Sequence, residues 1–157
     1  MNGKQYDAHT WLSRTWDTEA YIQNKVDQRD KLNSWGVGQY DAKHIPANTG
    51  ENTSETKLIN YTELSSEIEK KISEYMYQTS RTEEVINKVN NKLFRNILYG
   101  WYINHKDYKA LCSEYNYGST QIYAIRAKAL DAVYPFIPLD EIPENKYKSM
   151  QDYKIAE

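Results

Sequence analysis

The feature that most restricts the fold is a run of side chains between Leu58 and Leu93 that recurs in alternating steps of three and four residues. This spacing puts one side chain per turn on the same helical face and persists for about five heptads. No proline or glycine interrupts it. We therefore predict a long heptad helix over residues 57–90. Its seam positions are Leu58, Tyr61, Ser65, Ile68, Ile72, Tyr75, Thr79, Thr82, Ile86, Val89 and Leu93.

Two arrangements would bury this seam. The long helix can fold back on an earlier helix of the same chain to form a hairpin, or it can pair with another copy in a coiled coil. Polar seam residues such as Ser65 and Thr82 weaken either arrangement. Ser80 followed by Glu83 matches a capping box, so the pattern also allows a helix break near Thr79. The heptads do not decide between hairpin and coiled coil, and we expect a homodimer or a higher oligomer.

The N-terminal part supplies a partner for the long helix. Residues 6–33 contain no proline or glycine, and Trp11 and Trp16 lie on an apolar stripe with helical spacing. We predict an N-terminal helix within residues 1–33 that packs on the long helix. Residues 34–56 contain three glycines and a proline among Asn, Thr and Ser. That composition is typical of a flexible linker.

A second pair of amphipathic patterns lies between Asp107 and Val133, separated by residues 116–118, which have turn chemistry. Two short helices across such a turn form the outline of a helix-turn-helix. We expect its core to be Leu111, Tyr115, Ile122, Ile125 and Leu130. The apolar run before it, residues 91–103, contains Gly100, which would allow close packing against the motif. These elements together give a predicted DNA-binding domain over residues 91–134, and the prolines that follow indicate a C-terminal tail over 135–157.

Residues 98–133 resemble the helix-turn-helix of sigma-70 region 4, most closely in the run Ile-Arg-Ala-Lys-Ala-Leu at 125–130. Leu98, Tyr102 and Leu111 fit the same pattern. The combination resembles small phage and prophage proteins of the ArpU and RinA type, which regulate late-gene transcription. Two positions depart from that family: Gly118 stands where it usually has Ser or Thr as the helix cap, and Ala110 stands where it often has Glu.

The resemblance implies an all-α protein in which a helical hairpin or coiled coil precedes a DNA-binding helix-turn-helix. Its recognition helix, residues 119–133, would lie in the major groove of duplex DNA. By position, the side chains that face base edges are those of Ser119, Thr120, Tyr123 and Ala124. Those that flank or touch phosphates are Gln121, Arg126 and Lys128. On the preceding helix, Lys106 and Lys109 would hold the DNA backbone.

The charge distribution agrees with a nucleic-acid partner at one end only. The chain has a formal net charge of −2, yet residues 92–133 hold six basic and three acidic side chains, a net charge of +3. The remaining residues therefore carry −5. A basic segment on an acidic body suits local contact with a phosphate backbone.

Several function classes lack support in the sequence. There is no glycine-rich phosphate loop, nucleophile elbow or pair of histidines at metal-ligand spacing, so we predict no enzyme, no metal and no cofactor. The single Cys112 cannot form an intrachain disulfide, and we expect it in the core. No apolar run is long enough to span a membrane and no signal-peptide pattern is present. The expected location is the cytoplasm of a bacterial host.

Three functions remain in competition. The preferred one is a phage-type transcriptional regulator that binds duplex DNA. The second is an interaction module that docks on RNA polymerase or another protein. The third is a small DNA-packaging subunit of the terminase kind, because such proteins also join a turn motif to an oligomerising helix.

Overall fold

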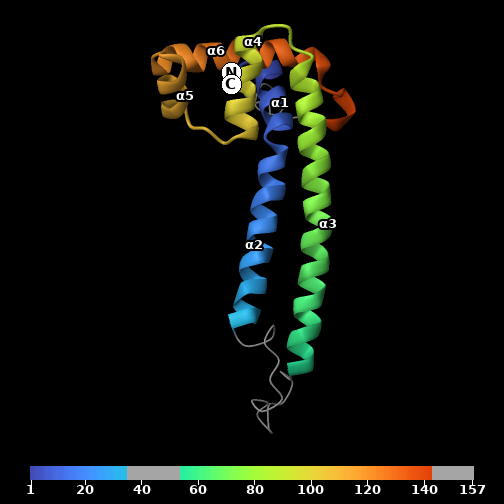
Figure 1. The fold of residues 1–157 in the computed structure, drawn as a ribbon. Coiled ribbons are helices and arrows are strands. Elements are labelled where there is room, and N and C mark those ends of the chain that lie inside the picture. Colours follow the sequence, from blue (N-terminus) through green and yellow to red (C-terminus); the bar gives the residue numbers. More distant parts are fainter. Residues whose placement is uncertain (35–53, 143–157) are drawn as a thin grey trace, which may run out of the picture. The chain divides into compact units, whose positions relative to one another are not determined.

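The computed structural model describes residues 1–34 and 54–142, and every regular element within these ranges is helical (Figure 1). The predicted all-α class is therefore confirmed. None of the described helices is long and apolar enough to cross a membrane. The helices are α1 (Gly3–Leu12), α2 (Arg14–Ser34), α3 (Ser54–Asn87), α4 (Lys92–Leu98), the π-helix η2 (Tyr99–Ile103), α5 (Tyr108–Tyr115), α6 (Ser119–Val133), and the 3-10 helices η3 (Tyr134–Phe136) and η4 (Leu139–Glu141).

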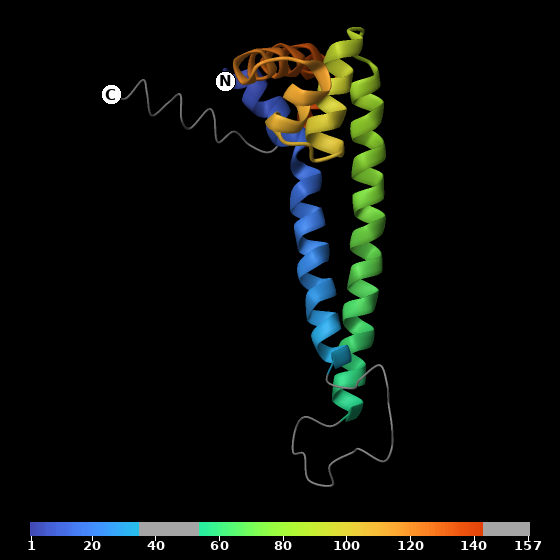
Figure 2. The same ribbon diagram turned by 60° about the vertical axis from the view of Figure 1, so that its left-hand side comes forward.

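The chain divides into two compact units, one of which, residues 16–77, is a helical hairpin. Within it α2 and α3 run side by side in opposite directions (Figures 1 and 2). Lys25 Nζ lies 3.5 Å from a carboxylate oxygen of Glu67, and Lys71 Nζ lies 5.0 Å from the centre of the Tyr21 ring. The seam residue Ile68 is buried. Part of the seam is thus buried inside the chain, as in the hairpin alternative, whereas the seam positions Leu58 and Ile72 remain exposed.

The helix boundaries differ from the predicted ones. α3 begins at Ser54, before the predicted start at residue 57, and passes through Thr79 without a break. The other unit contains residues 1–15 and the residues from 78 onward. The single helix predicted within 1–33 is two helices, because Ser13 leaves the helical conformation at φ −87° and ψ 0°. Of the predicted linker, residues 35–53 lie outside the described ranges.

α1 belongs to the core of this second unit and is not an extension of the hairpin. Ala8, Trp11 and Leu12 are fully buried. A reciprocal capping box starts the helix: Asn2 Oδ1 accepts from the Gln5 amide at 2.9 Å, and Gln5 Oε1 accepts from the Asn2 amide at 3.1 Å. A separate cap and three buried apolar side chains explain why α1 packs as an element of its own.

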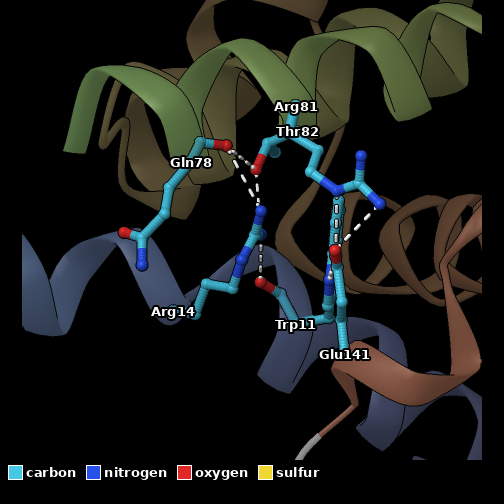
Figure 3. Close-up of polar contacts among 6 residues, drawn as sticks. All are labelled: Trp11, Arg14, Gln78, Arg81, Thr82 and Glu141. Carbon is cyan, nitrogen blue, oxygen red and sulfur yellow. Dashed lines mark hydrogen bonds and ion pairs between the residues drawn. The ribbon is translucent and has the colours of Figure 1, made fainter. Parts of the chain in front are cut away.

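Arg14 fastens α1 to the C-terminal part of α3 (Figure 3). Its Nη1 donates to the Trp11 carbonyl at 2.8 Å and to Thr82 Oγ1 at 2.9 Å, and its Nη2 donates to the Gln78 carbonyl at 3.3 Å. The guanidinium also lies 3.8 Å from the centre of the Trp11 indole. Thr82, a polar residue at a seam position, is fully buried and satisfied by these contacts.

Residues 135–142, predicted to open a tail, contain most of the 3-10 helix η3 and all of η4, and the segment packs on the core through Ile137 and Glu141. Ile137 is buried, and Glu141 in η4 pairs with Arg81 at 2.8 Å. Glu141 also accepts from the Trp11 indole nitrogen at 3.2 Å (Figure 3). The hydrogen bond from Arg81 is the main reason why the pKa of Glu141 is lowered. The rest of the predicted tail, residues 143–157, lies outside the described ranges.

Candidate nucleic-acid interface

α5 and α6 are joined by a three-residue turn whose conformation follows from its side chains. Asp107 caps α5 by accepting from the Ala110 amide at 2.8 Å, and Ala110 cannot return the bond as a Glu would. Asn116 ends α5 in the left-handed region, at φ 56° and ψ 39°, which Asn tolerates better than most residues. Gly118 is the N-cap of α6, and its amide donates to Gln121 Oε1 at 3.1 Å.

An apolar cluster behind the turn fixes the two helices on α4. Ile97, Leu111 and Ile122 are fully buried at its centre. Predicted burial is correct for Leu111, Ile122 and Leu130, whereas Tyr115 and Ile125 are only partly buried. The partly buried side chains packed on the cluster are Leu93, Trp101, Tyr108, Cys112, Tyr115, Tyr117 and Ile125.

Gly100 allows the close approach that the sequence indicated. It lies in the π-helical turn η2 and is buried. A Cβ atom at this position would come within 2.9 Å of Leu111 Cδ2, which is closer than real carbon atoms pack. With a side chain at residue 100, Leu111 would have to shift to keep α5 in contact with this turn.

The N-terminal half of α6 presents an exposed and mostly polar face. Ser119, Thr120, Gln121 and Ala124 are exposed, which the expected base-facing and flanking roles require. The Gln121 amide oxygen is already used by the Gly118 amide, so adenine recognition through both amide groups would require that capping bond to break.

Tyr123 combines exposure with a fixed ring. It is 45 % exposed. Its ring centre lies 5.7 Å from that of Trp101 in an edge-to-face arrangement and 5.6 Å from that of Tyr108. Aromatic pairs at these distances are attractive, so one edge of Tyr123 is anchored while the other remains accessible.

The structure corrects the predicted phosphate contact of Arg126. The side chain of this residue is only 9 % exposed. Nε donates to the Tyr102 hydroxyl at 3.3 Å, Nη2 lies 3.2 Å from His9 Nδ1, and the guanidinium lies 4.3 Å from the centre of the Trp101 ring. Arg126 therefore belongs to the contact between α1, η2 and α6.

The surroundings of Arg126 shift two titrations. Burial, followed by the positive charge of Arg126, lowers the pKa of His9. Burial raises the pKa of Tyr102 to about 12, against the opposing influence of Arg126. The Tyr102 hydroxyl lies 2.7 Å from His9 Nδ1. The neutral imidazole accepts at this atom, so its proton is assigned to Nε2.

Of the remaining basic residues that were predicted to contact phosphates, two face solvent and form no ion pair with an acidic side chain of the described residues. Lys109 and Lys128 are exposed and have no ion pair among the residues that the structure describes. Lys106 is paired with Glu114 at 2.7 Å. With Arg126 in the core and Lys106 neutralised, the exposed positive charge on this side is smaller than the net charge of the segment suggests.

The polar contacts between α1 and α6 could not be predicted from the sequence pattern. His9 and Arg126 are separated by 117 residues, and Gln5 and Asp131, whose side chains are joined by a hydrogen bond of 2.7 Å, are separated by 126. No local pattern connects such positions. In the described ranges, no three His, Cys, Asp or Glu side chains converge as a metal site would require.

Comparison of the chain with protein-family models, with curated proteins and with solved structures finds no match.

Proposed function

We propose that the protein is a phage-type transcriptional regulator that binds duplex DNA through α5 and α6, with the N-terminal half of α6 in the major groove. One observation carries the proposal. α6 buries Ile122 and Leu130 on one side, and leaves Ser119, Thr120 and Ala124 exposed at its N-terminal end on the other. A helix presented in this way after a short turn has the geometry with which such motifs read base edges.

The exposed side chains suit a weakly guanine-selective contact. Ser119 and Thr120 can donate to or accept from bases on either strand, and the Ala124 methyl and the accessible edge of Tyr123 can meet thymine methyl groups. No arginine stands on this face, because Arg126 points into the core. The recognition proposed here therefore favours A·T-containing sites.

Lys109 on α5 and Lys128 on α6 are assigned to the phosphates. Both are exposed and without an acidic partner in the described chain, so both can replace counterions of the DNA. The polar character of the face favours nucleic acid over a protein surface, whose central contacts are usually apolar and aromatic.

Salt-dependent binding of a short random-sequence duplex by the full chain tests the proposal, with fluorescence anisotropy as the readout. The affinity falls with salt, and each phosphate contact contributes about −0.9 to the slope of log affinity against log salt. The Lys109→Ala, Lys128→Ala double variant should therefore make this slope less negative by about 1.8. Lys70→Ala, on the exposed side of α3, is the matched control and should leave the slope unchanged. Salt-independent binding, or an unchanged slope in the double variant, would refute the proposal and favour docking on a protein.

A further inference from the structure

A cavity of about 370 Å³ lies between α1 and α6, within one compact unit. It is lined by Met1, Gln5, Tyr123, Arg126, Ala127 and Leu130. We propose that this cavity binds a small organic anion, a carboxylate with an apolar body, whose charged group pairs with Arg126. The proposal does not depend on DNA binding.

The charge of Arg126 is the first argument. The side chain is nine-tenths buried, yet no carboxylate of the described chain lies within ion-pair distance of it. Its hydrogen-bond partners, the Tyr102 hydroxyl and His9 Nδ1, are neutral groups. The Trp101 ring offsets part of the cost of burying this cation. Buried charges in proteins are otherwise paired, so the site lacks an anion.

The second argument is that one nitrogen of the Arg126 guanidinium, Nη1, has N–H donors without an acceptor in the described residues. Nε and Nη2 are engaged, whereas Nη1 has no acceptor within hydrogen-bond distance among the described residues. Guanidinium groups bind carboxylates through two parallel N–H donors. A carboxylate in the cavity would supply the acceptor that the protein leaves out.

The remaining wall decides the kind of anion. Met1, Ala127 and Leu130 contribute apolar side chains, and Tyr123 contributes a ring. Gln5 is already committed, because its Nε2 donates to Asp131 and its Oε1 accepts from the Asn2 amide. Asp131 carries negative charge near the site but does not line the cavity. Inorganic phosphate would meet one cation and apolar walls, whereas an organic carboxylate satisfies both. The volume suits a ligand of that size.

Titration of the full chain with three probes tests this pairing, followed through its amide resonances by NMR. The probes are benzoate, benzyl alcohol as its neutral counterpart, and inorganic phosphate. Benzoate should shift the resonances of Gln5, Ala127 and Leu130 with a dissociation constant on the order of millimolar. Benzyl alcohol and phosphate should bind at least tenfold more weakly. Equal binding of benzyl alcohol would show an apolar hollow without charge recognition and would overturn the proposal, as would equal binding of phosphate or no response to benzoate.

A substitution that fills the cavity tests where benzoate binds while Arg126 stays unchanged. Ala127→Leu places extra carbon atoms in the cavity and should weaken benzoate at least tenfold. Ala110→Leu makes the same change at an exposed position of α5 and should leave benzoate affinity unchanged. Benzoate that binds both variants like the wild type would place the ligand elsewhere and overturn the assignment. The comparison of benzoate with benzyl alcohol on the unaltered chain tests charge recognition whether or not the filled variant folds.

Discussion

Arg126 donates through Nε to the Tyr102 hydroxyl at 3.3 Å, and this buried bond joins α6 to η2. Tyr102 is itself fully buried and lies 2.7 Å from His9. A basic residue of the proposed recognition helix is thus part of the core. The surface that we propose for DNA is therefore limited to the N-terminal half of α6 with Lys109 and Lys128.

Removing the Arg126 side chain should therefore affect stability more than surface charge. We expect Arg126→Ala to lower the free energy of unfolding by roughly 2–4 kcal/mol, because the cation–aromatic contact and two hydrogen bonds are lost and a cavity forms. Lys128→Ala removes a cation from the exposed side of the same helix and should change stability by less than about 0.5 kcal/mol. Urea unfolding measures the change in the free energy of unfolding for both variants. Similar changes would show that the Arg126 side chain lies at the surface and not in the core.

The lowered pKa of His9 predicts a loss of stability in mild acid. Below its ordinary value near 6.5 the unfolded chain binds a proton that the folded chain resists, because burial and Arg126 disfavour the imidazolium. Stability associated with this group is complete above that pH and falls as the pH drops toward the folded-state value. The free energy of unfolding of the wild type should decline as the pH falls from about 7 to about 5.

His9→Asn provides the control for that decline. Its amide oxygen can accept near the position of Nδ1 but does not titrate. The variant should show a shallower decline over the same range, with a constant offset because Asn is smaller than His and fills less of this partly buried site. Parallel curves for the two proteins would assign the acid sensitivity to other groups.

The two glycines of this region should respond in opposite ways. Gly100→Ala forces a carbon atom to within 2.9 Å of the fully buried Leu111, and we expect a loss of about 1–3 kcal/mol. A Cβ atom on residue 118 would meet no other atom within 4 Å, so Gly118→Ser has room and supplies the missing N-cap hydroxyl. It should raise stability by about 0.3 kcal/mol. If Gly100→Ala leaves the free energy of unfolding unchanged, Leu111 can move aside to make room for the added carbon atom.

Sequence reasoning succeeded where the pattern was local. Heptad spacing indicated the long helix, and turn residues 116–118 marked the boundary between α5 and α6. For Arg126 the spacing predicts burial, since Ile122, Arg126 and Leu130 follow one another at steps of four on the buried face. The chemical type of the side chain and the resemblance outweighed that periodicity. The docking of α1 on α6 left no local trace, because it joins residues more than 100 positions apart.

The ion pair between Lys106 and Glu114 yields a prediction for the proposed DNA contact. At 2.7 Å the carboxylate neutralises a lysine expected near the phosphates. Glu114→Gln should release Lys106 and steepen the salt dependence of duplex binding, by about 0.9 in the slope of log affinity against log salt. Glu69→Gln removes an acid from the exposed side of α3 and controls for net charge. An equal change in both variants would indicate a long-range effect of charge and not release of Lys106.

The oligomeric state depends on the apolar side chains of α3, some of them at seam positions, that the hairpin leaves exposed. Since seam residues such as Ile68 are buried within the chain, a coiled coil between copies is not needed to bury them. Four aliphatic side chains of α3 nevertheless remain exposed: Leu58 at 44 %, Ile59 at 51 %, Ile72 at 41 % and Met76 at 64 %. Positions 58, 72 and 76 fall on one side of a helix with 3.6 residues per turn. Such a stripe favours pairing of two copies.

We expect the full chain to form a dimer at micromolar concentration, with twice the 18.5 kDa mass of the monomer in light scattering. Ile72→Glu combined with Met76→Glu should place four carboxylates in the paired stripe and return the protein to the monomer mass, without unfolding it, because both positions are exposed. Tyr77→Glu alters an equally exposed residue one helical step away, at 65 % exposure, and should leave the dimer intact. A second consequence concerns DNA. A dimer pairs two recognition helices, so the monomeric variant should lose affinity for duplexes with two half-sites while retaining that for one. A wild-type mass of 18.5 kDa would refute the dimer and leave the hairpin as the only use of the long helices.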